Sequence, residues 1–355
     1  MKEPNIFSYA TKELTQDAFI CWLARWADHQ YGQADPLMNR AGVIFLESLL
    51  KKAGRNGLLD KPVSVEVGQQ ENNIDVLIFI NGKTVILIED KTASSEHGKQ
   101  LERYSGYVEK NYLNMDLVKI YFKTGVQINL NSVKGVGFEP YLISDFVSAL
   151  KEAYENGVNN NIFIDAYHHF SEIDRKTNCF HETAIEHWKG DSRYWKGLFQ
   201  YFDSVFSCNN INNDFGAGIP RDITGYGSGL GFYFGWNKCV EHGVACYFRY
   251  VIKTKKLVVK IGTLESDSQA ISSQTKELYR DRLKCYFSNN NIDTSYANSN
   301  SKGKTATILN VSSDLVACKD GYIDRKQTGI NLLNLAMHIQ DFDLTSSDHS
   351  ITPSV

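Results

Sequence analysis

Two apolar runs flank a short polar turn in the stretch IDVLIFINGKTVILIEDKT, residues 74–92. Both runs are rich in isoleucine and valine, which favour β-strands. The turn is Asn81-Gly82, and Asn-Gly between two such runs is the strongest short-range signal of a β-hairpin. The pattern therefore predicts two antiparallel strands joined at this turn.

Charged residues stand at the open end of the predicted hairpin. Asp75 opens the first run, while Glu89, Asp90 and Lys91 close the second. Because side chains alternate across a strand, Glu89 and Lys91 share one face and Asp90 points to the other. Pairing back through the turn brings Asp75 near the end of the second strand. Two carboxylates and a lysine are therefore expected to converge at one end of an apolar sheet.

Hydrophobic periodicity predicts further elements on both sides of the hairpin. Apolar residues at helical spacing indicate two helices, followed by a strand, before the hairpin, and a helix, a strand and another helix after it. The order α-α-β-β-β-α-β-α predicts an α/β fold, a mixed sheet with helices on its faces. The predicted helices cover residues 11–30, 36–54, 98–112 and 143–155, and the additional strands cover 63–69 and 117–123.

The pattern changes in the second half of the chain. Aromatic residues recur at helical spacing over 188–206 and favour a buried core, and the Asn/Gly-rich stretch 209–228 is typical of a linker or long loop. Three strands at hairpin spacing, a helix, a strand and a closing helix then predict a second, C-terminal α+β domain. The expected domains are 1–155, a connector at 156–228, and 229–345.

The composition mainly excludes certain classes of protein. The chain has 355 residues, enough for two domains, with 42% hydrophobic and 22% charged residues, as in ordinary globular proteins. A net charge of −3 is not that of a protein that coats DNA, so nucleic-acid contact is expected only from a local patch. We find no apolar run long enough for a membrane span and no signal-peptide pattern. Seven cysteines without a CxxC pair predict neither a zinc ribbon nor a disulfide framework, which favours the cytoplasm.

The converging charges suit metal-assisted phosphate chemistry. The carboxylates of Asp75 and Glu89, with the backbone carbonyl of Asp90, are oxygen ligands of the kind that Mg²⁺ or Mn²⁺ prefers. The ammonium of Lys91 beside them suits a phosphate, or a water that attacks one. The alternative is a structural salt bridge between Lys91 and one of the acids in an unrelated enzyme.

Asp75 followed by Glu89-x-Lys91 on the next strand resembles the signature of the PD-(D/E)XK nuclease superfamily. The chain departs from that signature at Ile74, where the superfamily pattern has proline. The resemblance covers roughly residues 5–150 and implies a restriction-endonuclease-like mixed-sheet core of order αβββαβ.

Two further motifs extend the resemblance. Gln100 and Tyr104 lie four residues apart, on one helix face, and resemble the Q-x-x-x-Y helix of RecB-like members. The segment FSYATKELTQDAFICWLARWAD resembles the opening helix of a group of bacterial members, in which an early glutamate, here Glu13, reaches the site. The resemblance implies that Gln100 and Tyr104 support the lysine and that Glu13 completes the metal environment. An interaction with the helix dipole is the alternative role for Glu13.

The resemblance implies a metal-dependent nuclease that hydrolyses phosphodiester bonds in DNA, with RNA as the alternative substrate, in phage defence or DNA processing. A catalytically silent scaffold that binds nucleic acid or a partner protein is the competing hypothesis. The role of the C-terminal domain stays open between DNA binding, ligand sensing and homodimerisation. The candidate catalytic residues are Asp75, Glu89, Lys91, Gln100 and Tyr104, and the candidate ligands of Mg²⁺ or Mn²⁺ are Glu13, Asp75, Glu89 and Asp90.

Overall fold

A computed structural model of the protein shows two compact units, Met1–Asn178 and Cys179–Val355. Within the part of the chain that is described, no helix is both long and apolar enough to cross a membrane. The structure describes residues 13–57, 59, 62–92, 94, 98–188, 191–208, 221–224, 230–234, 244–263, 270–297, 303–312 and 315–340.

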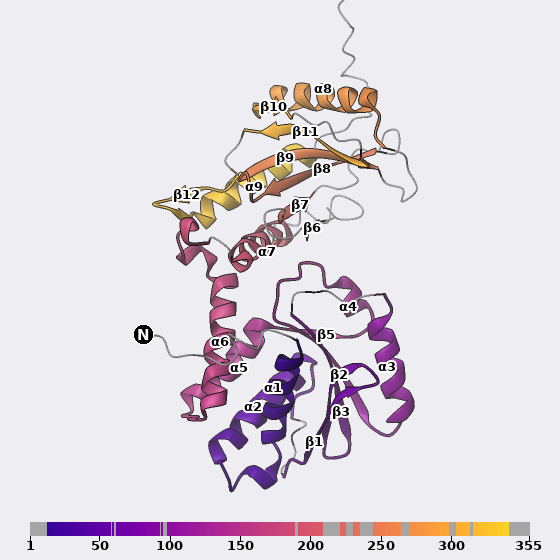
Figure 1. The fold of residues 1–355 in the computed structure, drawn as a ribbon, viewed down its shortest axis with the longest axis vertical. Helices are drawn as coiled ribbons and strands as arrows, with labels where there is room; N and C mark the ends of the chain where they lie inside the picture. The colour runs from indigo at the N-terminus through magenta and orange to yellow at the C-terminus, as the bar shows by residue number, and fades with distance from the viewer. Residues whose placement is uncertain are drawn as a thin grey trace, which may run out of the picture. The chain divides into compact units, whose positions relative to one another are not determined.

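The N-terminal unit is a five-stranded mixed sheet with helices on both faces (Figure 1). The strand order is β1-β2-β3-β4-β5, antiparallel from β1 to β3 and parallel from β3 to β5. This topology confirms the predicted α/β fold and its restriction-endonuclease-like αβββαβ core. The elements are α1 (Glu13–Trp26), η2 (His29–Tyr31), α2 (Pro36–Lys52), β1 (Val65–Glu71), β2 (Ile74–Ile80), β3 (Thr84–Lys91), α3 (Gln100–Asn111), β4 (Asp116–Lys123), α4 (Asn131–Gly135), β5 (Glu139–Leu142), α5 (Ile143–Glu155) and α6 (Asn161–Asn178).

The hairpin at the centre of this sheet forms as predicted. Its turn residues Asn81 and Gly82 have φ of 53° and 61°, the left-handed conformation that an Asn-Gly hairpin turn requires. Strand β3 is buried along its whole length, because helices cover both of its faces and β2 and β4 flank it. The charged residues that close β3 are therefore held inside the unit, where they need partners.

Side chains from the two faces of the sheet pack into two separate cores. Ile86 and Ile88 of β3 lie in the core formed with α1, α2 and α5. Val85 and Leu87 alternate with them and lie in the smaller core under α3. This alternation sends the side chains of Glu89 and Asp90 to opposite faces.

The first two helices pack closely because of one glycine. A Cβ at Gly42 of α2 would lie 2.8 Å from the carbonyl oxygen of Leu23 in α1, so only glycine permits this approach. At the end of α1, the Asp28 carboxylate accepts hydrogen bonds from the backbone N–H of Val65, at 2.9 Å, and from Arg25, at 3.0 Å. These contacts fix α1 against both α2 and β1.

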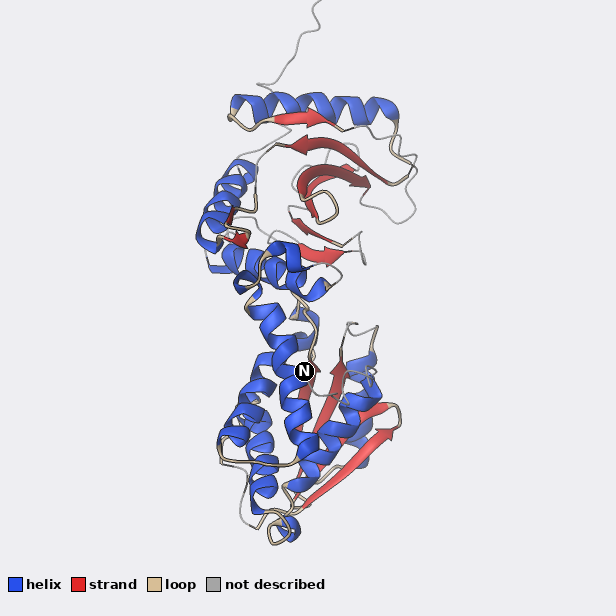
Figure 2. Cartoon of the chain, turned by 60° about the vertical axis from the view of Figure 1, so that its left-hand side comes forward, coloured by secondary structure: helices blue, strands red, loops and turns tan. Residues whose placement is uncertain are grey.

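The C-terminal unit contains a six-stranded antiparallel sheet of order β10-β11-β9-β8-β7-β6. The aromatic residues of α7 pack on it, with the rings of Phe199 and Phe232 centred 5.7 Å apart, so the predicted buried aromatic stripe is confirmed. Helix α8 packs along β10 and β11 (Figure 2). The elements are η3 (Phe180–Glu182), η4 (Ile185–Trp188), α7 (Ser192–Cys208), β6 (Arg221–Thr224), β7 (Gly231–Phe234), β8 (Val244–Val251), β9 (Lys256–Thr263), α8 (Ser273–Asn289), β10 (Thr294–Tyr296), β11 (Thr305–Val311), β12 (Cys318–Lys319), β13 (Tyr322–Ile323) and α9 (Arg325–Gln340).

The structure differs from the sequence-based expectation in its short strands and in the connector. Strand β6 lies inside the stretch 209–228 that we expected to be a linker, and β5 and β10 were not predicted. Each has only three or four residues, too few for a periodic signal, and each is stabilised by pairing with a neighbour. The expected connector is divided between the units, because α6 packs on α5 while α7 packs in the C-terminal unit.

Candidate active site

The open end of the β2–β3 hairpin brings three of the candidate side chains together. The ladder pairs Val76 with Ile88, which places Asp75 opposite Glu89. Asp75 Oδ2 accepts a hydrogen bond of 2.9 Å from the backbone N–H of Asp90. The Lys91 ammonium donates to Glu89 Oε1 and, at 3.2 Å, to the backbone carbonyl of Asp90.

Glu89 lies in an environment that disfavours its charged form. Its side chain is 0% exposed. Burial, together with the negative charge of Asp75, raises the pKa of the Glu89 carboxyl to about 7, although the ammonium of Lys91 opposes the shift. A carboxylate held this way binds a proton or another cation readily near neutral pH.

Asp90 points to the opposite face, toward helix α1. The amide of Gln16 donates to Asp90 Oδ1 and accepts, at 3.1 Å, from the hydroxyl of Thr124 at the end of β4. Burial and the neighbouring carboxylate of Asp17 raise the pKa of Asp90 well above its ordinary value. Helix α1 is thereby bound to the ends of both β3 and β4.

Three residues beside the candidate acids were not singled out from the sequence: Gln16, Asp17 and Gln70. The amide of Gln70 donates to Asp17 Oδ2 and to Asp75 Oδ1, each at 3.3 Å. Asp17 follows Glu13 by four residues, so helical spacing places both on one face and could have pointed to it. Gln16 carried no signal, because its partners are distant in sequence, and Gln70 carried none, because its left-handed backbone cannot be read from the sequence pattern.

Gln100 and Tyr104 lie on the α3 side of the sheet, toward which Glu89 and Lys91 also project. Gln100 Nε2 donates to the Tyr104 hydroxyl at 3.1 Å, and Tyr104 is buried in the core under α3. The predicted pairing of these two residues on one helix face is therefore present in the structure.

Strand β4 brings a second buried lysine to the same edge. Lys123 is the register partner of Lys91 on the neighbouring parallel strand. Its ammonium donates to the backbone carbonyls of Thr92, at 3.0 Å, and Ser94. Lys123 thus fastens the backbone that leaves β3 directly after Lys91, a role that nothing in the local sequence indicated.

The oxygen atoms at this edge fit a divalent cation. On the face that Asp75 and Lys91 share, Glu89 Oε2 is buried and accepts no hydrogen bond from any described residue. No three histidine, cysteine, aspartate or glutamate side chains form a preformed metal cage in the described residues. Mg²⁺ commonly takes only one or two protein carboxylates and completes its shell with water and substrate phosphate. The Asp75 and Glu89 carboxylates meet that smaller requirement, whereas the side chain of Glu13, the first residue of α1, lies outside the described residues.

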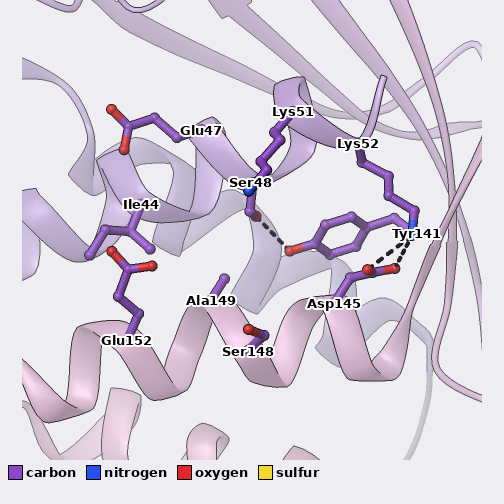
Figure 3. Close-up of a pocket in the computed structure, with 10 residues that line it drawn as sticks. All are labelled: Ile44, Glu47, Ser48, Lys51, Lys52, Tyr141, Asp145, Ser148, Ala149 and Glu152. Atoms are coloured by element: carbon purple, nitrogen blue, oxygen red, sulfur yellow. Dashed lines mark hydrogen bonds and ion pairs between the residues drawn. The ribbon is translucent and has the colours of Figure 1, made fainter. Parts of the chain in front are cut away.

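A separate groove between α2 and α5 has no comparable chemistry (Figure 3). It encloses about 530 Å³. Two pairs of its polar groups bind one another: Lys52 pairs with Asp145 at 2.8 Å, and the hydroxyls of Ser48 and Tyr141 lie 2.6 Å apart. Among the described residues, the buried Glu89 oxygen without a hydrogen-bond partner lies at the end of β3, which is the stronger candidate for an active site.

A comparison with known families found a match for the N-terminal unit. Residues 4–169 match the family model of the PD-(D/E)XK nuclease superfamily. No curated protein and no solved structure gave a significant match to the chain. The matched segment spans the whole mixed sheet and all three charged groups at its edge. The N-terminal unit of this chain therefore belongs to the PD-(D/E)XK nuclease superfamily.

Proposed function

We propose that the N-terminal unit hydrolyses phosphodiester bonds in DNA in a reaction that depends on Mg²⁺ or Mn²⁺. The observation that carries the proposal is the convergence of Asp75, Glu89 and Lys91 at one buried edge. Members of the superfamily generally hydrolyse nucleic acids with a divalent ion, and the three groups are the ones its signature names. Because Glu89 and Lys91 are buried and Asp75 is half-buried, an accidental surface grouping is a poor explanation.

Each side chain has a defined part in this proposal. When bound, the divalent ion supplies polarisation of the phosphate and a more acidic water. Asp75 and Glu89 hold the ion, and the low dielectric around Glu89 strengthens that interaction. Lys91 supplies positive charge beside the carboxylates, where negative charge develops on the phosphate. Gln100 and Tyr104 support Lys91 from helix α3. The backbone carbonyl of Asp90 lies next to the Lys91 ammonium.

The experiment that tests the proposal is a cleavage assay on single- and double-stranded DNA and RNA with Mg²⁺, Mn²⁺ or EDTA. We expect cleavage of DNA only with a divalent ion, and a loss of about 100-fold or more in Glu89→Ala and in Lys91→Ala. Glu109→Ala and Lys110→Ala, which change the same residue types at exposed positions of α3, are the matched controls and should keep wild-type rates.

Two outcomes would contradict this function. Wild-type cleavage rates in both Glu89→Ala and Lys91→Ala would remove the assigned site. DNA binding without any calorimetric binding of Mn²⁺ would instead favour the silent, binding-only scaffold.

A further inference from the structure

The tip of the β1–β2 hairpin contains an uncommon backbone conformation. Gln70 has φ of 54°, in the left-handed region that residues other than glycine, asparagine and aspartate rarely adopt. Asn72 and Asn73 are also left-handed, with φ of 51° and 65°, but they form the two-residue turn between Glu71 and Ile74, where asparagine is favoured. Gln70 precedes that turn, so the turn does not account for its conformation.

The left-handed residue inverts the alternation of side chains along β1. Val65 lies in the core formed with α1 and α2, and strict alternation would place Glu71 on the same face. Instead, Glu71 Oε1 accepts hydrogen bonds from the hydroxyls of Tyr107, at 3.0 Å, and Tyr112, at 2.6 Å, on the α3 side. The inversion occurs at Gln70, which would otherwise face α3.

The inversion aims the amide of Gln70 at the candidate site. Its Nε2 donates to Asp75 Oδ1 and to Asp17 Oδ2 at 3.3 Å each. The other oxygen of Asp75 accepts from the backbone N–H of Asp90 at 2.9 Å. Both oxygens of the Asp75 carboxylate are therefore held, one by β3 and one by Gln70. Because the Gln70 side chain is exposed, burial of apolar surface does not compensate for its backbone strain.

We propose that Gln70 is a positioning residue, which holds the Asp75 carboxylate in the orientation that binds a divalent cation and couples it to helix α1 through Asp17; this inference rests on the proposed function. Hydrogen-bond partners of metal-binding carboxylates commonly contribute 10- to 100-fold to metal affinity or activity. Strained backbone that persists beside a site, without a packing reason, is the kind of outlier that points to such a role.

The test compares Gln70→Gly and Gln70→Met with wild type, using the full chain. Glycine adopts the left-handed region without strain and lacks the amide, so Gln70→Gly should keep or raise the melting temperature in EDTA. The same variant should weaken Mn²⁺ binding, measured by calorimetry, by about 10- to 100-fold and lower kcat for DNA cleavage to a similar degree. Gln70→Met keeps the approximate length of the side chain but removes the donor without adding charge, so it should lose metal affinity as well.

Asn73→Gly is the matched control, because it relaxes a left-handed residue of the same hairpin; it should keep wild-type Mn²⁺ affinity and kcat. If Gln70→Gly lowers the melting temperature, or if both Gln70 variants bind Mn²⁺ as wild type does, the positioning role is wrong while the proposed nuclease stands. If wild type itself binds no Mn²⁺, both proposals fall. If wild type binds Mn²⁺ but cleaves no nucleic acid, only the nuclease function falls, and the Mn²⁺ affinities still decide the role of Gln70.

Discussion

At the scale of single residues, three consecutive side chains at the end of β3 have different surroundings. Glu89 lies beside Asp75 and Lys91, whereas Asp90 is bound by Gln16 of α1. The difference follows from strand alternation, which separates neighbours in sequence onto two faces of the sheet. One strand end thereby serves the candidate site with one face and anchors a helix with the other.

The raised pKa of Glu89 predicts how stability depends on pH in the metal-free protein. The carboxyl titrates near 4.5 when the chain is unfolded and at about 7 when it is folded, so the folded state binds more protons between these values. The contribution of Glu89 to the free energy of unfolding is therefore fully present below pH 4.5. It is lost as the pH rises through about 7, by up to about 1.4 kcal/mol per pH unit for one proton. Asp90, whose pKa is also raised, changes stability in the same direction.

Urea unfolding in EDTA at several pH values between 5 and 8 checks this expectation. Glu89→Gln should reduce the decline, because a neutral amide replaces the titrating group, whereas Glu109→Gln at an exposed position should leave it unchanged. A decline of the same size in Glu89→Gln and wild type would show that Glu89 is not its source.

At the scale of elements, the position of α1 is the decisive feature. The helix carries Gln16 and Asp17, and it is bound to α2 at Gly42 and to β1 through Asp28. A shift of α1 would move Gln16 and Asp17 away from Asp90 and Gln70. Packing far from the charged groups therefore governs their geometry.

Gly42→Ala tests this dependence. The added methyl would overlap the backbone of α1, and we expect a loss of about 1 to 3 kcal/mol in the free energy of unfolding, together with a lower cleavage rate. Gly106→Ala in α3 is the matched control: a Cβ there meets nothing within 4 Å, so it should stabilise the protein by about 0.5 to 1 kcal/mol. An unchanged stability in Gly42→Ala would show that α1 and α2 can separate without cost.

At the scale of the whole molecule, the candidate site is built entirely within the first compact unit. Asp75, Glu89, Lys91, Gln100 and Tyr104 all lie in Met1–Asn178. Both of the cores that cover this sheet are formed by residues of the same unit. The C-terminal unit supplies none of the contacts described for these groups.

A fragment of residues 1–178 should therefore fold by itself. We expect a single cooperative urea transition and Mn²⁺ binding equal to that of the full chain, because every described contact of the site is retained. Circular dichroism and calorimetry on the fragment measure both. A fragment without a cooperative transition would mean that the second unit is required for the stability of the first.

The local sequence pattern determined the central hairpin and the positions of most candidate site residues. The Asn81-Gly82 turn and the alternation around it were sufficient to place Asp75, Glu89 and Lys91 at one strand end, because register in a tight hairpin depends on neighbouring residues. Helical spacing likewise paired Gln100 with Tyr104. These features need only the chain within about one element of each residue.

Tertiary structure alone decided the contacts that join distant segments. Gln16 meets Asp90 and Thr124 only after α1 packs on the sheet, and Lys123 meets the backbone after β3 only through parallel pairing. The left-handed φ of Gln70 leaves no trace in composition or periodicity. Short strands such as β5 and β6 also depend on a partner strand for their hydrogen bonds, so only the assembled sheet reveals them.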